Sequence, residues 1–145
     1  MIFAKQKSFV NELEENIFPT FRDVLNQFNF VVKDYVVNKQ LFQKGIDGNK
    51  ERLPGYSRTT IRLKISKGQP VDRTTLHDSE KFVASIEIDA FSDRFEVSSN
   101  VSYDKYIIKR YTKDVLKPTK ENMEDFFRVY FLPNLKNYVN NQFAR

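Results

Sequence analysis

Apolar residues recur every three or four positions in the segment that follows Pro19. This spacing places their side chains on one face of a helix, and it predicts a helix over residues 21–44. Gly45 is expected to end that helix, because glycine readily adopts the left-handed conformation found just after helix C termini. A shorter stretch with four-residue spacing, residues 9–17, predicts a separate N-terminal helix. The apolar positions of the longer helix are Phe21, Val24, Leu25, Phe28, Val31, Val32, Tyr35, Val36 and Phe42.

A second long helix is predicted over residues 119–143. Pro118 and Thr119 can introduce it, since a threonine hydroxyl accepts hydrogen bonds from the free amides of a first turn. Pro133 lacks an amide hydrogen and its ring presses on the carbonyl of Val129, so a kink or break is expected there. The apolar face of this helix comprises Met123, Phe127, Phe131, Leu135, Tyr138 and Phe143.

Strict alternation of apolar and polar residues replaces the helical period between these two helices. Ile86, Ile88 and Ala90 alternate with polar residues, and a second alternating run begins at Phe95, after the turn-forming sequence FSDR. An antiparallel hairpin is therefore predicted over about residues 84–101. The segments on either side of it, HDSEKF and YDKYIIKRY, are predicted to form short helical turns, the first with Asp78 accepting from free amides.

The segment at 45–73 is predicted to be a protruding loop or arm, because it holds all four glycines of the chain. Within it, Ile61, Leu63 and Ile65 alternate with cations, which favours an exposed strand or extended segment. Ser57 could instead cap a short helix. The chain as a whole, residues 1–145, is thus expected to form a single α+β domain in which two long helices pack against a small antiparallel sheet.

The net charge of +5 is confined to this arm. Seven cations and two anions lie between residues 50 and 73, so the remainder of the chain is neutral. Such a segment can contact nucleic-acid phosphates or dock on an acidic surface of a neighbouring protein, and docking is the favoured interpretation. The candidate partner-binding or DNA-binding cations are Lys50, Arg52, Arg58, Arg62, Lys64, Lys67 and Arg73.

Residue types needed for common chemistries are scarce. With no cysteine and one histidine, a zinc, iron–sulfur or thiol site is not expected. His77, Asp78 and Ser85 are the candidate catalytic triad, but no glycine lies near Ser85 to form a nucleophile elbow or an oxyanion hole. GIDGNK does not match a phosphate-binding loop. We therefore expect no enzyme activity, no cofactor and no metal.

The sequence also gives expectations for the location of the protein. No apolar run approaches the roughly 20 residues that span a bilayer, and the N-terminal sequence is not typical of a signal peptide. A cytoplasmic protein that makes no membrane contact is expected.

The segment DSEKFVASI resembles the Asp-Thr-Gly-x-Leu-x-x-Ser-Ile pattern that precedes a strand in head-to-tail joining, or tail-completion, proteins of tailed double-stranded DNA phages. Asp78, Ser79, Phe82, Ser85 and Ile86 stand at the matching positions. Glu80 stands where that family usually has glycine. The flanking sequences LFQKGIDGNKERLPGYS and KGQPVDRTTL are similar to segments of small structural proteins from phages of Bacteroidetes-type hosts.

This resemblance implies a non-enzymatic virion subunit, assembled in the host cytoplasm, that forms a homo-oligomeric ring at the neck of the particle. Its implied partners are portal or adaptor proteins and tail-tube proteins, with non-specific DNA contact possible in the ring. Asp78 and Ser85 would then organise the turn that orients the hairpin. The alternative is a small basic nucleic-acid-binding protein that uses residues 50–73.

Overall fold

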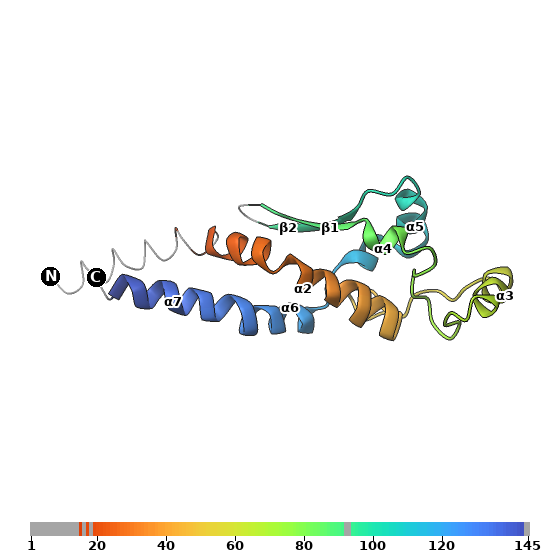
Figure 1. Ribbon diagram of the computed structural model, residues 1–145, viewed down its shortest axis with the longest axis horizontal. Helices are drawn as coiled ribbons and strands as arrows, with labels where there is room; N and C mark the ends of the chain where they lie inside the picture. Colours follow the sequence, from red (N-terminus) through yellow and green to blue (C-terminus); the bar gives the residue numbers. More distant parts are fainter. Residues whose placement is uncertain (1–14, 16, 18, 92–93, 144–145) are drawn as a thin grey trace.

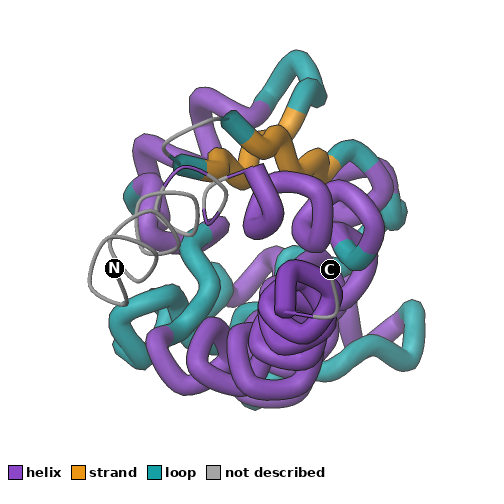
Figure 2. Tube along the Cα trace, turned by 90° about the vertical axis from the view of Figure 1, so that its left-hand side faces the viewer, coloured by secondary structure: helices purple, strands orange, loops and turns teal. Residues whose placement is uncertain are grey.

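The computed structural model describes residues 15, 17, 19–91 and 94–143. It shows an elongated α+β protein, as predicted, in which two long helical stretches run side by side (Figure 1). A two-stranded hairpin lies along one side of these helices, as the view along the long axis also shows (Figure 2). The arm occupies the end opposite the C-terminal part of helix α7 (Leu132–Phe143).

The first helical stretch follows the predicted course from residue 21 to residue 44. Residues 21–27 are α-helical, and after Phe28 the chain continues as helix α2 (Asn29–Asp34) and the π-helical segment η1 (Tyr35–Phe42). Phe28 interrupts the helix with φ −115° and ψ 25°, a break that the apolar spacing did not predict. The predicted helix over residues 9–17 lies outside the described residues, except for residues 15 and 17, which are helical.

Gly45 ends this stretch as expected. Its φ is 62°, in the left-handed region, and its amide donates to the carbonyl of Leu41 at 3.0 Å. A Cβ atom added at Gly45 would lie 2.9 Å from Cβ of Arg73, so the segment that returns from the arm packs directly on this glycine. Glycine is thus required here for both conformation and space.

The second stretch comprises helix α6 (Lys120–Phe126), the π-helical segment η3 (Phe127–Phe131) and α7. Thr119 caps it as predicted, accepting a hydrogen bond from the amide of Asn122 at 3.3 Å. The chain stays helical through Pro133, so the helix does not break there, and the alternative expectation of a kink stays a prediction. The irregularity lies in the turns before it, where the amide of Leu132 donates to the carbonyl of Phe127 in the wider π pattern.

The hairpin consists of β1 (Ile86–Ala90) and β2 (Phe95–Ser99), within the predicted range. Ile88 pairs with Val97 and Ala90 with Phe95, so the apolar positions of both strands share one face. That face packs on the helices: Ile88, Ala90 and Phe95 contact the core cluster built around Leu25, Val32 and Phe126.

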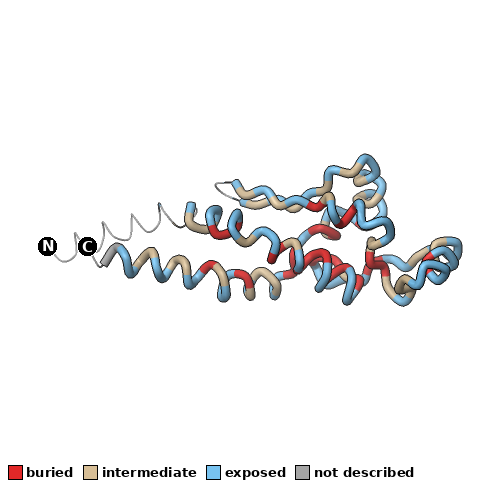
Figure 3. Tube along the Cα trace, in the orientation of Figure 1, coloured by how far each residue is buried: buried red, intermediate tan, exposed pale blue. Residues whose placement is uncertain are grey.

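A second core cluster lies nearer the arm. It joins η1 to helix α4 (Lys81–Ala84), helix α5 (Asp104–Tyr111) and the 3₁₀ turn η2 (Lys113–Leu116). Buried residues gather in this middle part of the molecule (Figure 3). The arm extends beyond it, and only its inner surface is covered.

The arm contains helix α3 (Arg58–Ser66), so the prediction of a strand or extended segment there is wrong. The alternative prediction holds, because Ser57 caps the helix and its hydroxyl accepts from the amide of Thr60 at 3.3 Å. The buried side of α3 carries Lys64 rather than an isoleucine or leucine. The apolar periodicity that usually marks a helix is therefore missing from this segment.

Candidate functional site

The base of the arm, residues 45–53, lies against the body of the protein and does not protrude. The Asp47 carboxylate accepts from the amides of Asn49 (2.8 Å) and Glu51 (2.9 Å). The amide of Gly48 donates to the carbonyl of Asp114 at 2.8 Å, and a Cβ atom there would lie 2.4 Å from the carbonyl oxygen of Lys117. The projecting part therefore begins after Leu53, which is itself buried in the core.

Hydrogen bonds join the outgoing and returning segments of the arm. The Thr74 hydroxyl donates to the carbonyl of Pro54 at 2.6 Å, and the amide of Thr75 donates to the Tyr56 hydroxyl at 2.8 Å. Arg73 reaches back to the first long helix, where its Nε donates to the carbonyl of Phe42 at 2.6 Å. Paired along its length in this way, the arm is a defined projection and not an open loop.

Lys64 attaches α3 to the returning segment. Its side chain is buried, with 4% of the residue exposed. Nζ donates to the carbonyl of His77 at 2.8 Å and lies 4.7 Å from the centre of the Tyr56 ring. A buried ammonium needs such partners, because desolvation of the charge is unfavourable. Lys64 therefore has a structural role and is not available to an external partner.

Most of the other predicted cations also have partners within the chain. Lys67 Nζ lies 2.7 Å from an Asp78 carboxylate oxygen, and Arg73 lies 2.7 Å from Asp72. Lys50 forms an ion pair with Glu121 in α6, and Arg52 donates to the carbonyl of Asp72 at 2.8 Å. Lys50, Arg52, Lys67 and Arg73 therefore already have partners within the chain, and their contact with an external partner stays a prediction.

Arg58 and Arg62 are the exceptions. Both are exposed on α3, and neither has a hydrogen bond or ion pair with the described part of the chain. Leu63 and Ile65, which follow Arg62 on the same helix, are 57% and 61% exposed. We call these four residues the arm tip. Arginine is enriched at protein interfaces, so these two exposed and unpaired arginines are suited to contact a partner.

The turn at residues 78–86 has a different geometry from the one predicted. Asp78 does not cap α4; its carboxylate binds Lys67, and this hydrogen bond lowers the pKa of Asp78. Glu80 occupies the N-cap position in the left-handed conformation, with φ 62°. After the turn, Phe82 and Ile86 are buried in the core.

Ser85 links the turn to the hairpin. Its hydroxyl donates to the carbonyl of Phe82 at 2.6 Å and lies 2.7 Å from the hydroxyl of Ser99 on β2. Ser79, the remaining position of the motif, is exposed beside a groove of about 520 Å³ between α3, α4 and α5. Leu63 of the arm tip lines the same groove. The motif residues thus surround one junction, where the turn meets both the arm and the hairpin.

The three residues of the candidate triad have separate partners. His77 Nδ1 lies 3.3 Å from Glu80, its Nε2 lies 3.4 Å from the carbonyl of Val37, and its ring packs 5.0 Å from that of Phe42. Ser85 is bonded to Phe82 and Ser99, as described above. The hydrogen bonds among the described residues therefore do not connect His77 with Ser85, as a nucleophile and its base require.

The outer face of the hairpin carries exposed carboxylates that the sequence analysis did not single out. Glu87 and Asp89 on β1 and Glu96 on β2 are exposed, and Asp89 stands directly opposite Glu96 in the strand register. Glu96 is 2.9 Å from Arg94, and Glu87 accepts from Asn100 at 3.2 Å. We call Glu87, Asp89 and Glu96 the acidic hairpin face. Alternation along the strands predicted that these positions point outward, but did not indicate that like charges would stand opposite each other.

Within the described ranges, no group of three or more histidine, cysteine, aspartate or glutamate residues could hold a metal ion. Across the same residues, no helix has the length and apolar character needed to cross a membrane.

Comparison with protein-family models, with curated proteins and with solved structures found no match to this chain.

Proposed function

We propose that this chain is a structural subunit of a tailed double-stranded DNA phage particle and not an enzyme. In this role it is a head-to-tail connector or tail-completion protein that forms a homo-oligomeric ring at the neck. Its neighbours in the virion are a portal or adaptor protein on one side and a tail-tube protein on the other. The ring is assembled in the host cytoplasm and stays in the particle.

The conformation of Glu80 is the observation that carries the proposal. Its φ of 62° lies in the region that glycine adopts freely and that other residues adopt at a cost. The phage pattern that DSEKFVASI resembles usually has glycine at this position. Glu80, which stands where the pattern has glycine, thus has the backbone conformation for which that glycine is suited, which supports a shared turn.

The other motif positions also support the proposal. The aliphatic or aromatic position, Phe82, and the last position, Ile86, are buried. The serine, Ser85, bonds across to Ser99 and so fixes the start of β1 against β2. Phe82, Ser85 and Ile86 therefore each have a physical role where the turn meets the strand, which is the location of the pattern in the phage family.

The arm supports a role in assembly. A projection held by its own hydrogen bonds, with Arg58, Arg62, Leu63 and Ile65 exposed at its end, is suited to contact another subunit. A subunit in a ring needs two different surfaces, one for each neighbour.

The test is an assembly measurement on the purified chain. Its mass would be determined by native mass spectrometry over a range of concentrations, and rings would be sought by negative-stain electron microscopy. The portal and tail-tube proteins encoded beside its gene would then be added. We expect a ring that co-migrates with at least one of them. A chain that stays monomeric and binds neither protein would overturn the proposal.

Nucleic-acid binding is the second candidate function, and the unpaired Arg58 and Arg62 favour it. Two phosphate contacts give a slope of log K against log salt of about −2, whereas seven contacts would give about −6. Anisotropy titration of labelled duplex DNA at several salt concentrations measures this slope. A slope near −2 that Arg58→Ala with Arg62→Ala abolishes would favour nucleic-acid binding over assembly.

A further inference from the structure

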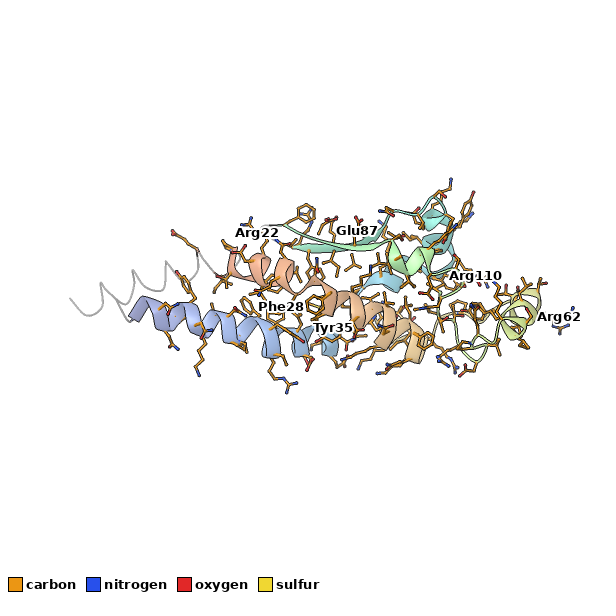
Figure 4. The ribbon with its side chains drawn as sticks, in the orientation of Figure 1. Arg22, Phe28, Tyr35, Arg62, Glu87 and Arg110 are labelled. Atoms are coloured by element: carbon orange, nitrogen blue, oxygen red, sulfur yellow. The ribbon has the colours of Figure 1, made fainter. Side chains whose placement is uncertain are left out.

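Two exposed surfaces of opposite charge lie at separate places on this chain. The arm tip carries Arg58 and Arg62, and the acidic hairpin face carries Glu87, Asp89 and Glu96. In Figure 4, Arg62 lies at the extreme end of the arm, whereas Glu87 lies on the hairpin, with α4 and Arg110 between them. Because the arm is bonded to the body at its base, the two surfaces cannot meet within one molecule.

The acidic hairpin face lacks enough positive charge of its own. Asp89 and Glu96 are cross-strand neighbours, and like charges in this arrangement destabilise a hairpin. Arg94 contacts Glu96, while Asp89 has no ion pair among the residues described. A cation brought by a partner would therefore relieve repulsion as well as form a new pair.

A groove lined by both polar and apolar side chains runs beside these carboxylates. It encloses about 360 Å³ between α2 and β1, and Glu87 and Asp89 are among the residues that line it. Phe30 lies at its edge with 63% of its surface exposed. Lys33, which also lines the groove, donates to the carbonyl of Ala84 at 3.2 Å and is thereby held. The groove can accept an aliphatic side chain next to the acidic residues.

The spacing of the charges is matched. Arg58 and Arg62 lie one turn apart on α3, which separates their Cβ atoms by about 6 Å. Glu87 and Asp89 lie two residues apart on β1 and point to the same side, which separates them by about 6.6 Å. A helix laid along the strand could therefore pair both arginines with both carboxylates at once.

We propose that the arm tip of one copy of this chain docks on the acidic hairpin face of the next copy. Arg58 and Arg62 pair with Glu87 and Asp89, while Leu63 or Ile65 packs on Phe30 in the groove. Such a contact joins two different surfaces, so repeated copies close into a ring when the rotation between them permits. The contact depends only on features of this chain, whereas its role in a neck ring rests on the proposed function.

Charge reversal tests the contact. One variant carries Arg58→Glu and Arg62→Glu, and a second carries Glu87→Lys and Asp89→Lys. All four side chains are exposed, so folding should be retained, as circular dichroism can check. Lys109→Glu with Lys136→Glu is the matched control for the arginine variant, since both lysines are exposed and the net charge falls by the same amount. Sedimentation equilibrium measures self-association of each protein.

We expect each reversed variant to associate at least about 100-fold more weakly than the unaltered chain, because like charges then face each other. The lysine control should associate normally. Mixing the two variants, or combining all four substitutions in one chain, should restore association. Restoration is decisive, since a merely structural defect would not be repaired by a second reversal.

Each alternative result would overturn the contact. An unaltered chain that stays monomeric would do so, and portal or tail-tube binding by that monomer would leave the virion proposal standing. Assembly that persists in both reversed variants would place the interface elsewhere and would likewise spare the virion proposal. Loss of DNA binding without loss of self-association in the arginine variant would assign the arm tip to nucleic acid.

Discussion

The ammonium of Lys64 lies 4.7 Å from the centre of the Tyr56 ring and donates to the carbonyl of His77 at 2.8 Å. This contact joins the two segments of the arm from the inside. Lys64 therefore occupies the buried position of α3, where most amphipathic helices have an aliphatic residue. The position of α3, and therefore the direction of Arg58 and Arg62, depends on it.

Replacement of Lys64 by alanine should loosen the arm. The substitution leaves the carbonyl of His77 without its donor and removes the cation–π contact, which together are expected to cost about 2–3 kcal/mol. Hydrogen exchange of the amides in residues 57–66, compared with those of α6, would measure the effect. Arg62→Ala is the control on the same helix, and its amides should exchange as in the unaltered chain. Equal protection in both variants would contradict a structural role for Lys64.

Two glycines in the arm allow a matched comparison. A methyl group at Gly48 would lie 2.4 Å from the carbonyl oxygen of Lys117, whereas none of the described atoms lies within 4 Å of the same position at Gly55. Gly48→Ala should therefore lower the free energy of unfolding by more than about 1 kcal/mol, and Gly55→Ala should change it by less than about 0.5 kcal/mol. Urea denaturation of both variants checks this difference.

The long helices and the hairpin could be predicted because each buries one apolar face. The period of Ile86, Ile88 and Ala90 fixed the inward side of β1 correctly. The same signal failed for α3, since its covered position is Lys64 and its aliphatic residues Leu63 and Ile65 face outward. The alternation of aliphatic residues with cations in this segment arose because Leu63 and Ile65 are exposed, and it did not indicate a strand.

The candidate site could be predicted only in part. The excess of cations in the sequence identified the arm, but it could not indicate that Lys67 forms an ion pair with Asp78 or that Lys50 forms one with Glu121. Those pairs depend on how the arm folds back and on where α6 passes its base. Arg58 and Arg62 differ from the other cations by their position on the exposed side of α3, and no property of their residue type indicated this.

The left-handed conformation of Glu80 leads to a stabilising substitution. Glu80→Gly should relieve a conformational cost of about 1 kcal/mol, with some of this gain lost to the greater freedom of glycine in the unfolded chain. Lys81→Gly, at the next residue, is the control and should destabilise the protein by about 1 kcal/mol, because Lys81 has helical geometry in α4. Thermal unfolding of the two variants should shift in opposite directions. A lower melting temperature for Glu80→Gly would show that its contact with His77 outweighs the backbone cost.

The ion pair between Asp78 and Lys67 should make the arm sensitive to acid. The hydrogen bond from Lys67 lowers the pKa of Asp78 in the folded protein below its value in the unfolded chain, which is about 3.9. The pair therefore stabilises the arm fully above about pH 4, and this contribution is lost as the pH falls through the lowered pKa. Carbon-detected NMR of the carboxyl groups would follow the titration. In the Lys67→Met variant the midpoint of Asp78 should rise toward the ordinary value, and an unchanged midpoint would contradict the pairing.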